Sequence, residues 1–584
     1  MVQTFPQVLL WLVGLALTQE VHTVKASSCK VLPEDEEWPT PAEWEQFNVT
    51  VGGRLLGPVI PLSAPCHDNP SGLGSYDADE CSKITASWHS TELHIHHPTS
   101  ILYPLFSNNS CLHSTDRFSP CTRGYYPIYV VNISTPDQIS ATVSFAKAKN
   151  VRLNIKNTGH DFLGRSTGRG SLSIWTTHLK SIELIDSYAG ETEYTGHAVK
   201  FGAGVSVLDL LEATDKADKM ILGGAQRSVG VGGGFLAAGG HSPLSSRFGL
   251  AVDSVLEFDI VLANGSFVTA TQKSYPDIFW AVRGGGGSTF GVVTSWTLRT
   301  FDTMPTTTIR MKFNASNEEN YWKAVSTFLE ITPNMGDQGV YSFVVLRNQV
   351  MHITALYGPN LTVAELDQLL NPFLERLHSD AIKYTKKSLH VTSFFPAFYE
   401  TNAVTKAGWD AAMASRLIPR DVVENNLDSL VSELKKLSTF ANGEPRVIYL
   451  MSFNPICTVE PNLCDNSVNP VWRKSVTHVV ANLPQSRNMT MSDIKRRARL
   501  HVLDDFQPMR DLTPGSGAYM NEASDFEPDF QEAFYGVNYG RLYEIKQKYD
   551  PTGVFYATQA VGSENWTESD GVLCSNDGVE VKVD

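Results

Sequence analysis

The sequence lacks several features that define common classes of protein. Its N-terminal apolar run, residues 8–17, is shorter than the roughly 20 residues of a membrane-spanning helix. It has no excess of basic residues: 47 Lys and Arg against 62 Asp and Glu give a net charge of −15. That charge disfavours nucleic acid or an anionic membrane as the main partner. We find no internal repeat and no low-complexity tract.

Two short motifs are also missing. No Cys-x-x-Cys pair occurs, which argues against a zinc site or a redox-exchange motif. No glycine cluster follows the order strand, Gly-x-Gly-x-x-Gly, helix with an acid about 20 residues further on. A nicotinamide site of the Rossmann type is therefore disfavoured.

The N-terminus and the scattered sequons predict secretion. The apolar run is followed at once by polar residues, so we interpret residues 1–26 as a secretory signal cleaved after Thr18 or Ala26. A basic n-region is absent, and the alternative is an apolar first helix of a cytosolic protein. Scattered Asn-x-Ser/Thr triplets are candidate N-glycan acceptors jointly favouring secretion, among them those at Asn48, Asn132, Asn264, Asn314, Asn360, Asn488 and Asn565.

The eight cysteines are even in number and lie near the two ends of the chain, which predicts disulfides. Three pairs would each close a short loop, and the remaining two would tie the ends together: Cys66 with Cys81, Cys111 with Cys121, Cys457 with Cys464, and Cys29 with Cys574. Sequence alone leaves this connectivity open.

A histidine loop at residues 156–166 is the most informative segment. Thr135 can cap a helix with Pro136 at its first position, and the alternating segment 151–155 then predicts a half-buried strand that leads into the loop. Gly159 would let the backbone approach a ligand, and exposed N–H groups there suit a pyrophosphate. By itself the loop could equally be a tight turn with a surface histidine.

Further glycine clusters follow, at residues 223–234, 239–242 and 283–291, the last just before a strand that contains Val293. So much glycine in loops raises the entropic cost of folding. It therefore favours a purpose such as close packing of backbone around a long phosphate-bearing ligand.

Changes in composition divide the chain into segments. We expect a disulfide-stapled N-terminal lobe over 27–122, a ligand-binding domain over 123–303, and a second domain over 304–503. The second domain has alternating segments typical of antiparallel strands, with a helix at 422–437 covering one face of the sheet. A C-terminal segment, 504–566, and a tail, 567–584, complete the chain.

In order along the chain, these motifs resemble the berberine bridge enzyme-like group of secreted fungal oxidases, within the vanillyl-alcohol oxidase and p-cresol methylhydroxylase superfamily. The match covers residues 125–301 and the C-terminal segment 517–566, with Tyr519-Met520-Asn521-Glu522 and a later helix ended by Pro551. The resemblance implies an α+β fold: a two-lobed FAD-binding domain, an antiparallel-sheet substrate domain, and a C-terminal segment that returns to the FAD domain.

The resemblance also implies the cofactor and its contacts. His160 would form an 8α-histidyl bond to FAD, and Gln226 stands where many relatives carry a second attachment cysteine, so attachment would be single. Val229 occupies the oxygen-gate position, and its small side chain favours an oxidase over a dehydrogenase. The implied cofactor contacts are Lys156, Asn157, Thr158, Gly159, His160, Asp161, Gly224, Ser228, Val229, Gly230, Gly233, Gly234, His241, Val293, Asn538 and Tyr539. We interpret His241 as organising a glycine-rich turn; no metal is expected.

Tyr519, with Asn521 completing its motif, is implied as the general base. A free tyrosine has a pKa of about 10, so cationic or hydrogen-bonding neighbours would be needed to lower it. The alternative is a structural phenol with one hydrogen bond.

We therefore expect a secreted, monomeric FAD oxidase of an alcohol, sugar or amine, with O2 as acceptor and H2O2 as product, in fungal secondary metabolism or carbohydrate oxidation. Second-domain aromatics could set specificity or equally form core: Phe394, Phe395, Phe398 and Tyr399. The rivals are a dehydrogenase with another acceptor and a secreted binding protein that keeps the fold without turnover.

Overall fold

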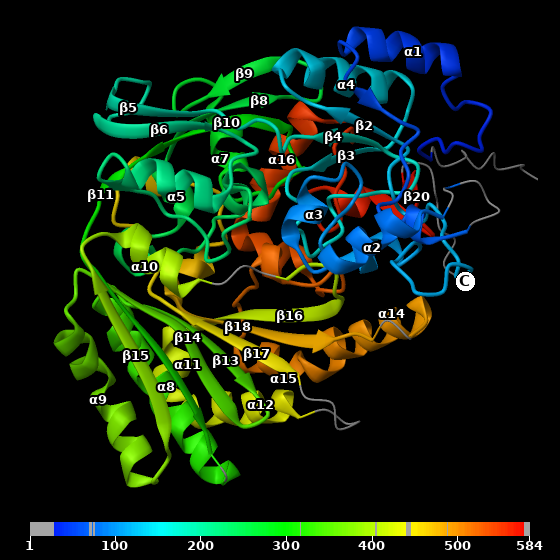
Figure 1. The fold of residues 1–584 in the computed structure, drawn as a ribbon. Coiled ribbons are helices and arrows are strands. Elements are labelled where there is room, and N and C mark those ends of the chain that lie inside the picture. Colours follow the sequence, from blue (N-terminus) through cyan, green and yellow to red (C-terminus); the bar gives the residue numbers. More distant parts are fainter. Residues whose placement is uncertain are drawn as a thin grey trace, which may run out of the picture.

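The computed structural model describes residues 29–68, 73, 76–315, 317–402, 406–439, 446–486 and 489–576. The predicted signal over 1–26, the sequon at Asn488 and residues 577–584 of the predicted tail lie outside them. Two α+β bodies face one another (Figure 1). Within the described ranges, no helix combines the length and apolarity needed to cross a membrane.

The first body contains a small sheet of order β1-β2-β4-β3, whose three longer strands are parallel. Its strands are β1 (Leu55–Leu56), β2 (Tyr129–Asn132), β3 (Leu153–Lys156) and β4 (Leu172–Trp175). Helix α4 (Pro136–Ala148) connects β2 to β3 and buries Ile139 and Val143. Thr135 forms its capping box with Gln138, so the predicted cap, helix and following strand are confirmed.

A second, antiparallel sheet completes this body, in the order β5-β6-β10-β8-β9. Its strands are β5 (Ile182–Tyr188), β6 (Gly196–Gly202), β8 (Val255–Val261), β9 (Phe267–Ala270) and β10 (Val292–Arg299), with helices α5 (Val207–Asp215), α6 (Ser245–Phe248) and α7 (Pro276–Val282) beside them. A short pair, β7 (Lys219–Met220) and β11 (Phe301–Asp302), leads toward the second body.

The second body is built on a seven-stranded antiparallel sheet of order β15-β12-β14-β13-β17-β18-β16, which confirms the predicted antiparallel strands. The strands are β12 (Thr306–Asn314), β13 (Tyr341–Arg347), β14 (Val350–Pro359), β15 (Tyr384–Val391), β16 (Ala411–Pro419), β17 (Val447–Ser452) and β18 (Ser475–Pro484). The helices are α8 (Glu318–Asp337), α9 (Val363–Ser379), α10 (Phe394–Thr401), α11 (Arg420–Asn425) and α12 (Leu427–Ser438).

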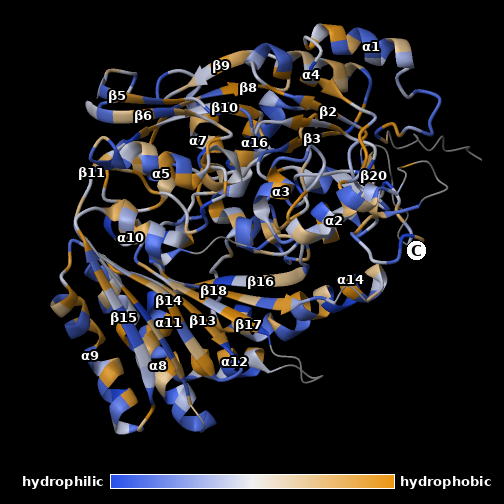
Figure 2. Ribbon diagram, in the orientation of Figure 1, coloured by the Kyte–Doolittle hydropathy of each residue, from blue (hydrophilic) through white to orange (hydrophobic). Residues whose placement is uncertain are grey.

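Because side chains alternate along each strand, the two faces of this sheet pack into different hydrophobic cores. Val344 and Leu450 pack with the buried residues of α8, α9 and α12, and these helices carry both hydrophobic and hydrophilic residues (Figure 2). Tyr341, Met451 and Val480 instead join the core of the first body. The sheet face that meets the first body is therefore apolar and aromatic.

The prediction of one continuous helix over 422–437 is wrong, because two helices, α11 and α12, occupy this range. Asn426 between them has φ −134° and ψ 29°, outside the helical region. Val422 and Leu430 on either side are buried in the same core. The hydrophobic periodicity therefore continues across the break and gives no sign of it.

After β18, α14 (Met491–Leu500) lies beside the second sheet. The C-terminal segment follows with α15 (Gln507–Leu512) and then returns to the first body through α16 (Tyr539–Tyr549). Lys546 of α16 is buried, and its Nζ donates to the carbonyl of Thr289 and pairs with Asp550, both at 2.7 Å. The predicted tail starts as a hairpin of β19 (Trp566–Ser569) and β20 (Val572–Ser575), held by an ion pair of 2.8 Å between Arg152 and Glu568.

The N-terminal segment carries α1 (Pro41–Thr50), α2 (Ala78–Ser87) and α3 (Thr91–Ile95). This segment is joined to the first body, because β1 pairs with β2 inside the first sheet. All four disulfide pairings suggested by spacing are confirmed: Cys29–Cys574, Cys66–Cys81, Cys111–Cys121 and Cys457–Cys464.

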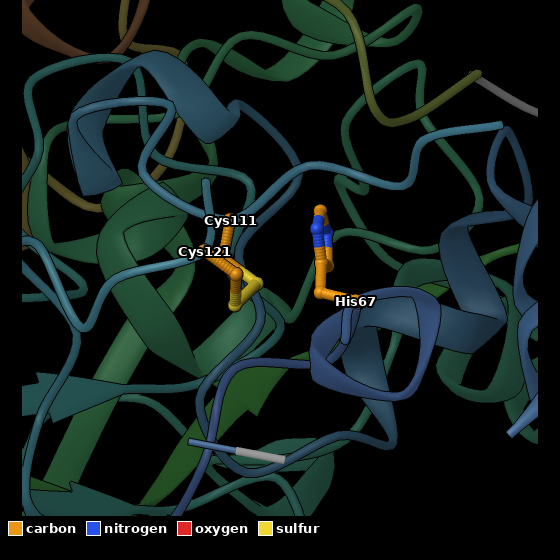
Figure 3. A group of neighbouring side chains, drawn as sticks. All are labelled: His67, Cys111 and Cys121. Carbon is orange, nitrogen blue, oxygen red and sulfur yellow. A yellow bond between two sulfur atoms is a disulfide. The ribbon is translucent and has the colours of Figure 1, made fainter. Parts of the chain in front are cut away.

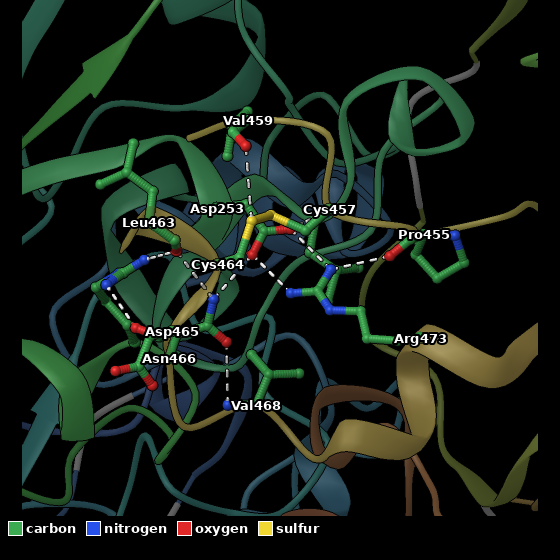
Figure 4. A network of polar contacts seen from close by, with 12 residues as sticks. Asp253, Pro455, Cys457, Val459, Leu463, Cys464, Asp465, Asn466, Val468 and Arg473 are labelled. Carbon is green, nitrogen blue, oxygen red and sulfur yellow. Dashed lines mark hydrogen bonds and ion pairs between the residues drawn. A yellow bond between two sulfur atoms is a disulfide. The ribbon is translucent and has the colours of Figure 1, made fainter. Parts of the chain in front are cut away.

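A loop of the second body is fixed to the first body by buried ionic contacts (Figure 4). Asp253, which is fully buried, accepts hydrogen bonds of 2.8 and 2.7 Å from the guanidinium of Arg473 and one of 2.8 Å from Asn466. The Cys457–Cys464 disulfide closes this loop. A bidentate Arg–carboxylate pair with a further hydrogen bond offsets the desolvation of both charges, so the two bodies are held in one orientation here.

Candidate functional site

A cavity of about 360 Å³ lies where the aromatic face of the second sheet meets the glycine-rich loops of the first body. The predicted site residues that line it come from four separate segments: Asn157, Thr158, Gly159, His160, Asp161, Gly224, Val229, Gly230, Gly233, Gly234, His241, Val293, Tyr519 and Asn521. The fold thus brings together most of the residues named from the sequence.

His160 lies in the loop that follows β3, where Gly159 has a φ of +79°. Nε2 of its ring is 2.9 Å from Oγ of Ser228, a residue that does not itself line the cavity. Burial lowers the pKa of His160 to about 4. The imidazole is therefore neutral at neutral pH, which leaves one ring nitrogen with a free lone pair.

The glycine segment that includes Gly230 packs directly onto the histidine loop. A Cβ at Gly230 would lie 2.7 Å from Oδ1 of Asn157, and one at Gly232 would lie 2.6 Å from the backbone of Ala203. Gly234 is less crowded: a Cβ there would meet only Oδ1 of Asn521, at 3.6 Å. Gly234 therefore keeps the cavity open, whereas the first two glycines allow backbone packing.

Asn157 supplies a polar atom that the described protein groups leave unsatisfied. Its Nδ2 donates to the carbonyl of Ala203 at 2.6 Å. Its Oδ1 is buried and has no hydrogen-bond partner among the described residues. Such an orphaned acceptor in a cavity wall indicates a ligand that donates to it.

The second body supplies an aromatic wall that the sequence analysis missed. Tyr341 and Phe343 of β13 and Tyr449 of β17 line the cavity, together with Trp409 from the loop before β16 and Tyr103 from the N-terminal segment. The alternation of Tyr341 and Phe343 in a predicted strand placed them on one face. Nothing in the sequence indicated which face, and the two loop residues carried no periodic signal.

The aromatic candidates on α10 do not form this wall. Phe394 and Phe398 are fully buried in the core. Tyr399 is exposed, and the Arg227 guanidinium lies 4.2 Å from its ring centroid. Phe394 and Phe398 are therefore core residues and not part of the cavity wall.

Tyr519 is buried at the cavity wall beside Asn521. Nδ2 of Asn521 donates to the Tyr519 hydroxyl at 2.9 Å and to the carbonyl of Gly234 at 2.9 Å. Burial and the Glu522 carboxylate raise the pKa of Tyr519 well above its ordinary value, and the hydrogen bonds from Asn521 and the Gly240 backbone only partly oppose them. The lowered tyrosine pKa that a general base would need is thus absent from the protein groups alone.

Three predicted contact residues lie away from the cavity. Lys156 follows Ile155 in β3, and because strand side chains alternate, Ile155 lines the cavity while Lys156 points to the other side. Its Nζ donates to the carbonyl of His97 at 2.9 Å, which ties the loop to the N-terminal segment. Asn538 donates to the carbonyl of Val468 at 3.0 Å, and Tyr539 donates to Glu564, so both position α16.

A second cluster with metal-ligand side chains lies apart from the cavity. His67 faces Cys111 and Cys121, which are joined to one another as a disulfide (Figure 3). Both ring nitrogens of His67 lie within 2.9 Å of backbone carbonyls, those of Ser119 and Leu112. Metal binding by cysteine requires thiolates, so this cluster does not form a metal site in its oxidised state.

Two family descriptions match this chain: an FAD binding domain over residues 127–271 and "berberine and berberine like" over residues 518–562. FAD-linked oxidoreductase patO of Penicillium expansum is 38% identical over 569 residues, covering 96% of this chain and 97% of that protein. The chain belongs to the berberine bridge enzyme-like FAD-linked oxidoreductases. This confirms the resemblance, the α+β fold and the assignment as an oxidoreductase.

VAO-type flavoprotein oxidase VAO615 of Thermothelomyces thermophilus is another relative of this oxidoreductase, 36% identical over 96% of this chain and 98% of that protein. The crystal structure of VAO-type flavoprotein MtVAO615 from Myceliophthora thermophila superimposes with a TM-score of 0.88, covering 94% of this chain and all of that one at 35% identity. The orphaned Oδ1 of Asn157 and the open side of Gly234 fit an FAD bound along the cavity.

Proposed function

We propose that this FAD-dependent oxidoreductase is a secreted oxidase that removes a hydride equivalent from a carbon bearing an alcohol or amine group and passes the electrons to O2, yielding H2O2. The observation that carries the proposal is a single cavity in which the His160 loop, Tyr519 and the aromatic wall of the second sheet meet. A relative named as an oxidase supports the choice of acceptor.

Bound FAD supplies the hydride acceptor. His160 is proposed to form the covalent 8α bond, because its ring is neutral, lines the cavity and contacts Ser228 through Nε2. Gln226 also lines the cavity and offers no thiol, so a second bond to the cofactor is not expected. Asn157 and the glycines at 230, 233 and 234 would bind the cofactor along its length.

Substrate would lie between the cofactor and the second sheet. Tyr103, Trp409 and Tyr449 present aromatic surface to the cavity, which suits a ring-bearing or otherwise flat substrate. Tyr519 is proposed to accept the proton of the substrate hydroxyl or amine while Asn521 holds the phenol in place. Val229 lines the cavity with a small side chain, which leaves a path for O2.

Secretion and N-glycosylation belong to the same proposal. Disulfides form and persist in oxidising compartments, and four of them are present. All the sequon asparagines named from the sequence except Asn488 lie in described parts of the chain, and each of these is half-buried or exposed. These positions suit glycans added in the secretory pathway.

The test is a panel of alcohols, sugars and amines mixed anaerobically with the yellow protein, followed by admission of air. We expect at least one compound to bleach the flavin and air to restore the colour with stoichiometric H2O2. Bleaching that air does not reverse would favour a dehydrogenase with another acceptor. A flavin that no member of the panel bleaches would favour the binding protein.

A further inference from the structure

A group of side chains that commonly bind metals lies at the cavity and has no role in the function proposed so far. His241, His478 and Glu522 each place one nitrogen or oxygen atom within 4.8 Å of the others. They come from the loop after Gly240, from β18 and from the segment that carries Tyr519. His241 and Glu522 line the cavity, while His478 is fully buried.

His478 is short of polar partners. Neither of its ring nitrogens has a hydrogen-bond partner among the described residues, although its side chain is fully buried. Buried polar groups in native proteins are normally satisfied, so this ring indicates a further partner. Its Nδ1 lies 3.4 Å from a carboxylate oxygen of Glu522, so a partner of that atom would also be close to the carboxylate.

The spacing within the group fits coordination of one ion. Nε2 of His241 forms a long contact of 3.4 Å to one oxygen of Glu522, equal to the distance from Nδ1 of His478 to the other. Hydrogen bonds from a charged donor to a carboxylate are about 2.7–2.9 Å long. Two atoms that bind the same zinc ion at about 2.0–2.2 Å, in tetrahedral arrangement, lie about 3.3–3.6 Å apart. Both separations therefore match those between ligands of a shared cation.

The surroundings of His241 suit a metal ligand. Its ring stacks on Phe453 with centroids 5.3 Å apart, and the preceding Gly240 has a φ of +73°, which favours glycine. The second ring nitrogen, Nδ1, faces the hydroxyl of Tyr341 at 3.5 Å. Metal-binding histidines use their second nitrogen in such an outer contact, which fixes the ring and leaves the first nitrogen for the metal.

Two imidazoles and one carboxylate also define the class of ion. This set of ligands suits zinc and the neighbouring divalent ions of the first transition row. Calcium and magnesium prefer oxygen ligands, so they fit less well. The group contains no cysteine, so the disulfide that rules out a metal beside His67 is not an obstacle here. Three protein ligands leave a coordination position open, as in catalytic zinc sites.

We propose that His241, His478 and Glu522 bind one divalent cation of the zinc class, and that an oxygen or nitrogen atom of the substrate takes its open position. Because His241 and Glu522 line the cavity, the substrate can reach the ion. The cation acts as a Lewis acid that holds the substrate and favours loss of its O–H or N–H proton to Tyr519, without changing its own oxidation state. The two electrons still leave the carbon as hydride. The substrate role rests on the proposed oxidase function, whereas the metal site does not.

The metal site is tested on the holoenzyme without turnover. The protein is treated with a chelator, dialysed and titrated separately with Zn²⁺, Mn²⁺, Co²⁺ and Ni²⁺, and bound metal is measured by calorimetry and elemental analysis. We expect one equivalent of Zn²⁺ to bind with a Kd on the order of 1 µM or tighter. Failure of all four ions to bind stoichiometrically would overturn the proposal.

Two variants locate the ion. His478→Gln and Glu522→Gln should each weaken Zn²⁺ binding by at least about 100-fold, since each removes a ligand to the metal itself. Glu522→Gln keeps the shape of a half-buried side chain, and circular dichroism and flavin content check the fold of both variants. His378→Gln, at an exposed histidine of α9, is the matched control and should bind as the wild type does. Wild-type affinity in folded Glu522→Gln would overturn the assignment of ligands.

The substrate role is tested with a compound that bleaches the flavin. Removal of the metal should slow anaerobic flavin reduction and raise KM, and added Zn²⁺ should restore both. An unchanged rate and KM in the metal-free holoenzyme would overturn this role while leaving the oxidase function intact. A flavin that no compound bleaches would count against the oxidase function and not against the metal site, which the titration decides independently.

Discussion

The hydroxyl of Ser228, which does not itself line the cavity, lies 2.9 Å from Nε2 of His160. When this hydroxyl accepts from Nε2–H, Nδ1 carries the lone pair that bond formation to FAD requires. Ser228→Ala should therefore slow covalent attachment, and a larger share of the flavin should be released when the protein is precipitated with acid. Ser144→Ala, an exposed serine on α4, is the matched control. Full attachment in Ser228→Ala would show that His160 needs no such support.

Attachment should be single and should involve His160 alone. Peptide mass mapping of the acid-precipitated, still yellow protein should find FAD on the peptide that contains this histidine, because Gln226 provides no sulfur for a second bond. In His160→Ala, the flavin should dissociate more readily and have a lower reduction potential, with the fold retained. Flavin found on any other peptide would contradict this expectation.

The glycine that keeps the cavity open can be tested without disturbing the backbone. A Cβ at Gly234 meets only Asn521, at 3.6 Å, so Gly234→Leu should fold and yet fill the space intended for the cofactor. We expect flavin content, measured by the ratio of visible to ultraviolet absorbance, to fall at least tenfold. Gly540→Leu is the control, because a Cβ at Gly540 meets nothing within 4 Å. Equal flavin in both variants would place the cofactor elsewhere.

Buried histidines should make the protein less stable in acid. Burial lowers the pKa of His501 to about 3, although its hydrogen bond to Ala481 opposes the shift. An unfolded histidine has a pKa of about 6.5, so only the unfolded state gains a proton as the pH falls below that value. His501 alone should remove about 2 kcal/mol from the free energy of unfolding between about pH 6.5 and pH 5.

Urea unfolding at these two pH values measures this loss, and His501→Gln should reduce it. The exposed His378→Gln should not. An unchanged pH dependence in His501→Gln would mean that the ring is protonated in the folded state.

Two aromatic substitutions should separate specificity from stability. Phe398 is fully buried, so Phe398→Ala should cost about 3–5 kcal/mol in the free energy of unfolding with little change in substrate preference. Tyr449 lines the cavity and is only half-buried, so Tyr449→Ala should mainly raise KM for good substrates. Thermal unfolding and steady-state kinetics on both variants check this. A substrate preference changed by Phe398→Ala alone would reverse the assignment.

Local signals in the sequence predicted the elements that depend on local causes. The capped helix after Thr135, the strand before the histidine loop and the alternating strands of the second sheet were all found because cap chemistry and side-chain period act over a few residues. The break at Asn426 was missed, because the buried positions on either side share one core and maintain the same period.

The cavity depends on contacts between distant segments, and these were predicted only in part. Gly234 and Asn521 were both named from motifs, yet their direct contact needs the fold. Glu522 was quoted in the same motif as Tyr519 but given no role. Its neighbours His241 and His478 lie about 280 and 44 residues earlier in the chain and meet it only in the fold. Trp409 lies in a loop with no period, so only packing places it at the cavity.

The Cys29–Cys574 bond joins residues 545 positions apart and so turns nearly the whole chain into a covalent ring. A single cut of the backbone inside that ring opens it without producing two molecules. An enzyme exposed to extracellular proteases would thus keep its FAD-binding loops, its aromatic wall and its C-terminal segment on one piece after a first cleavage. Such damage would become visible as separate fragments only after reduction.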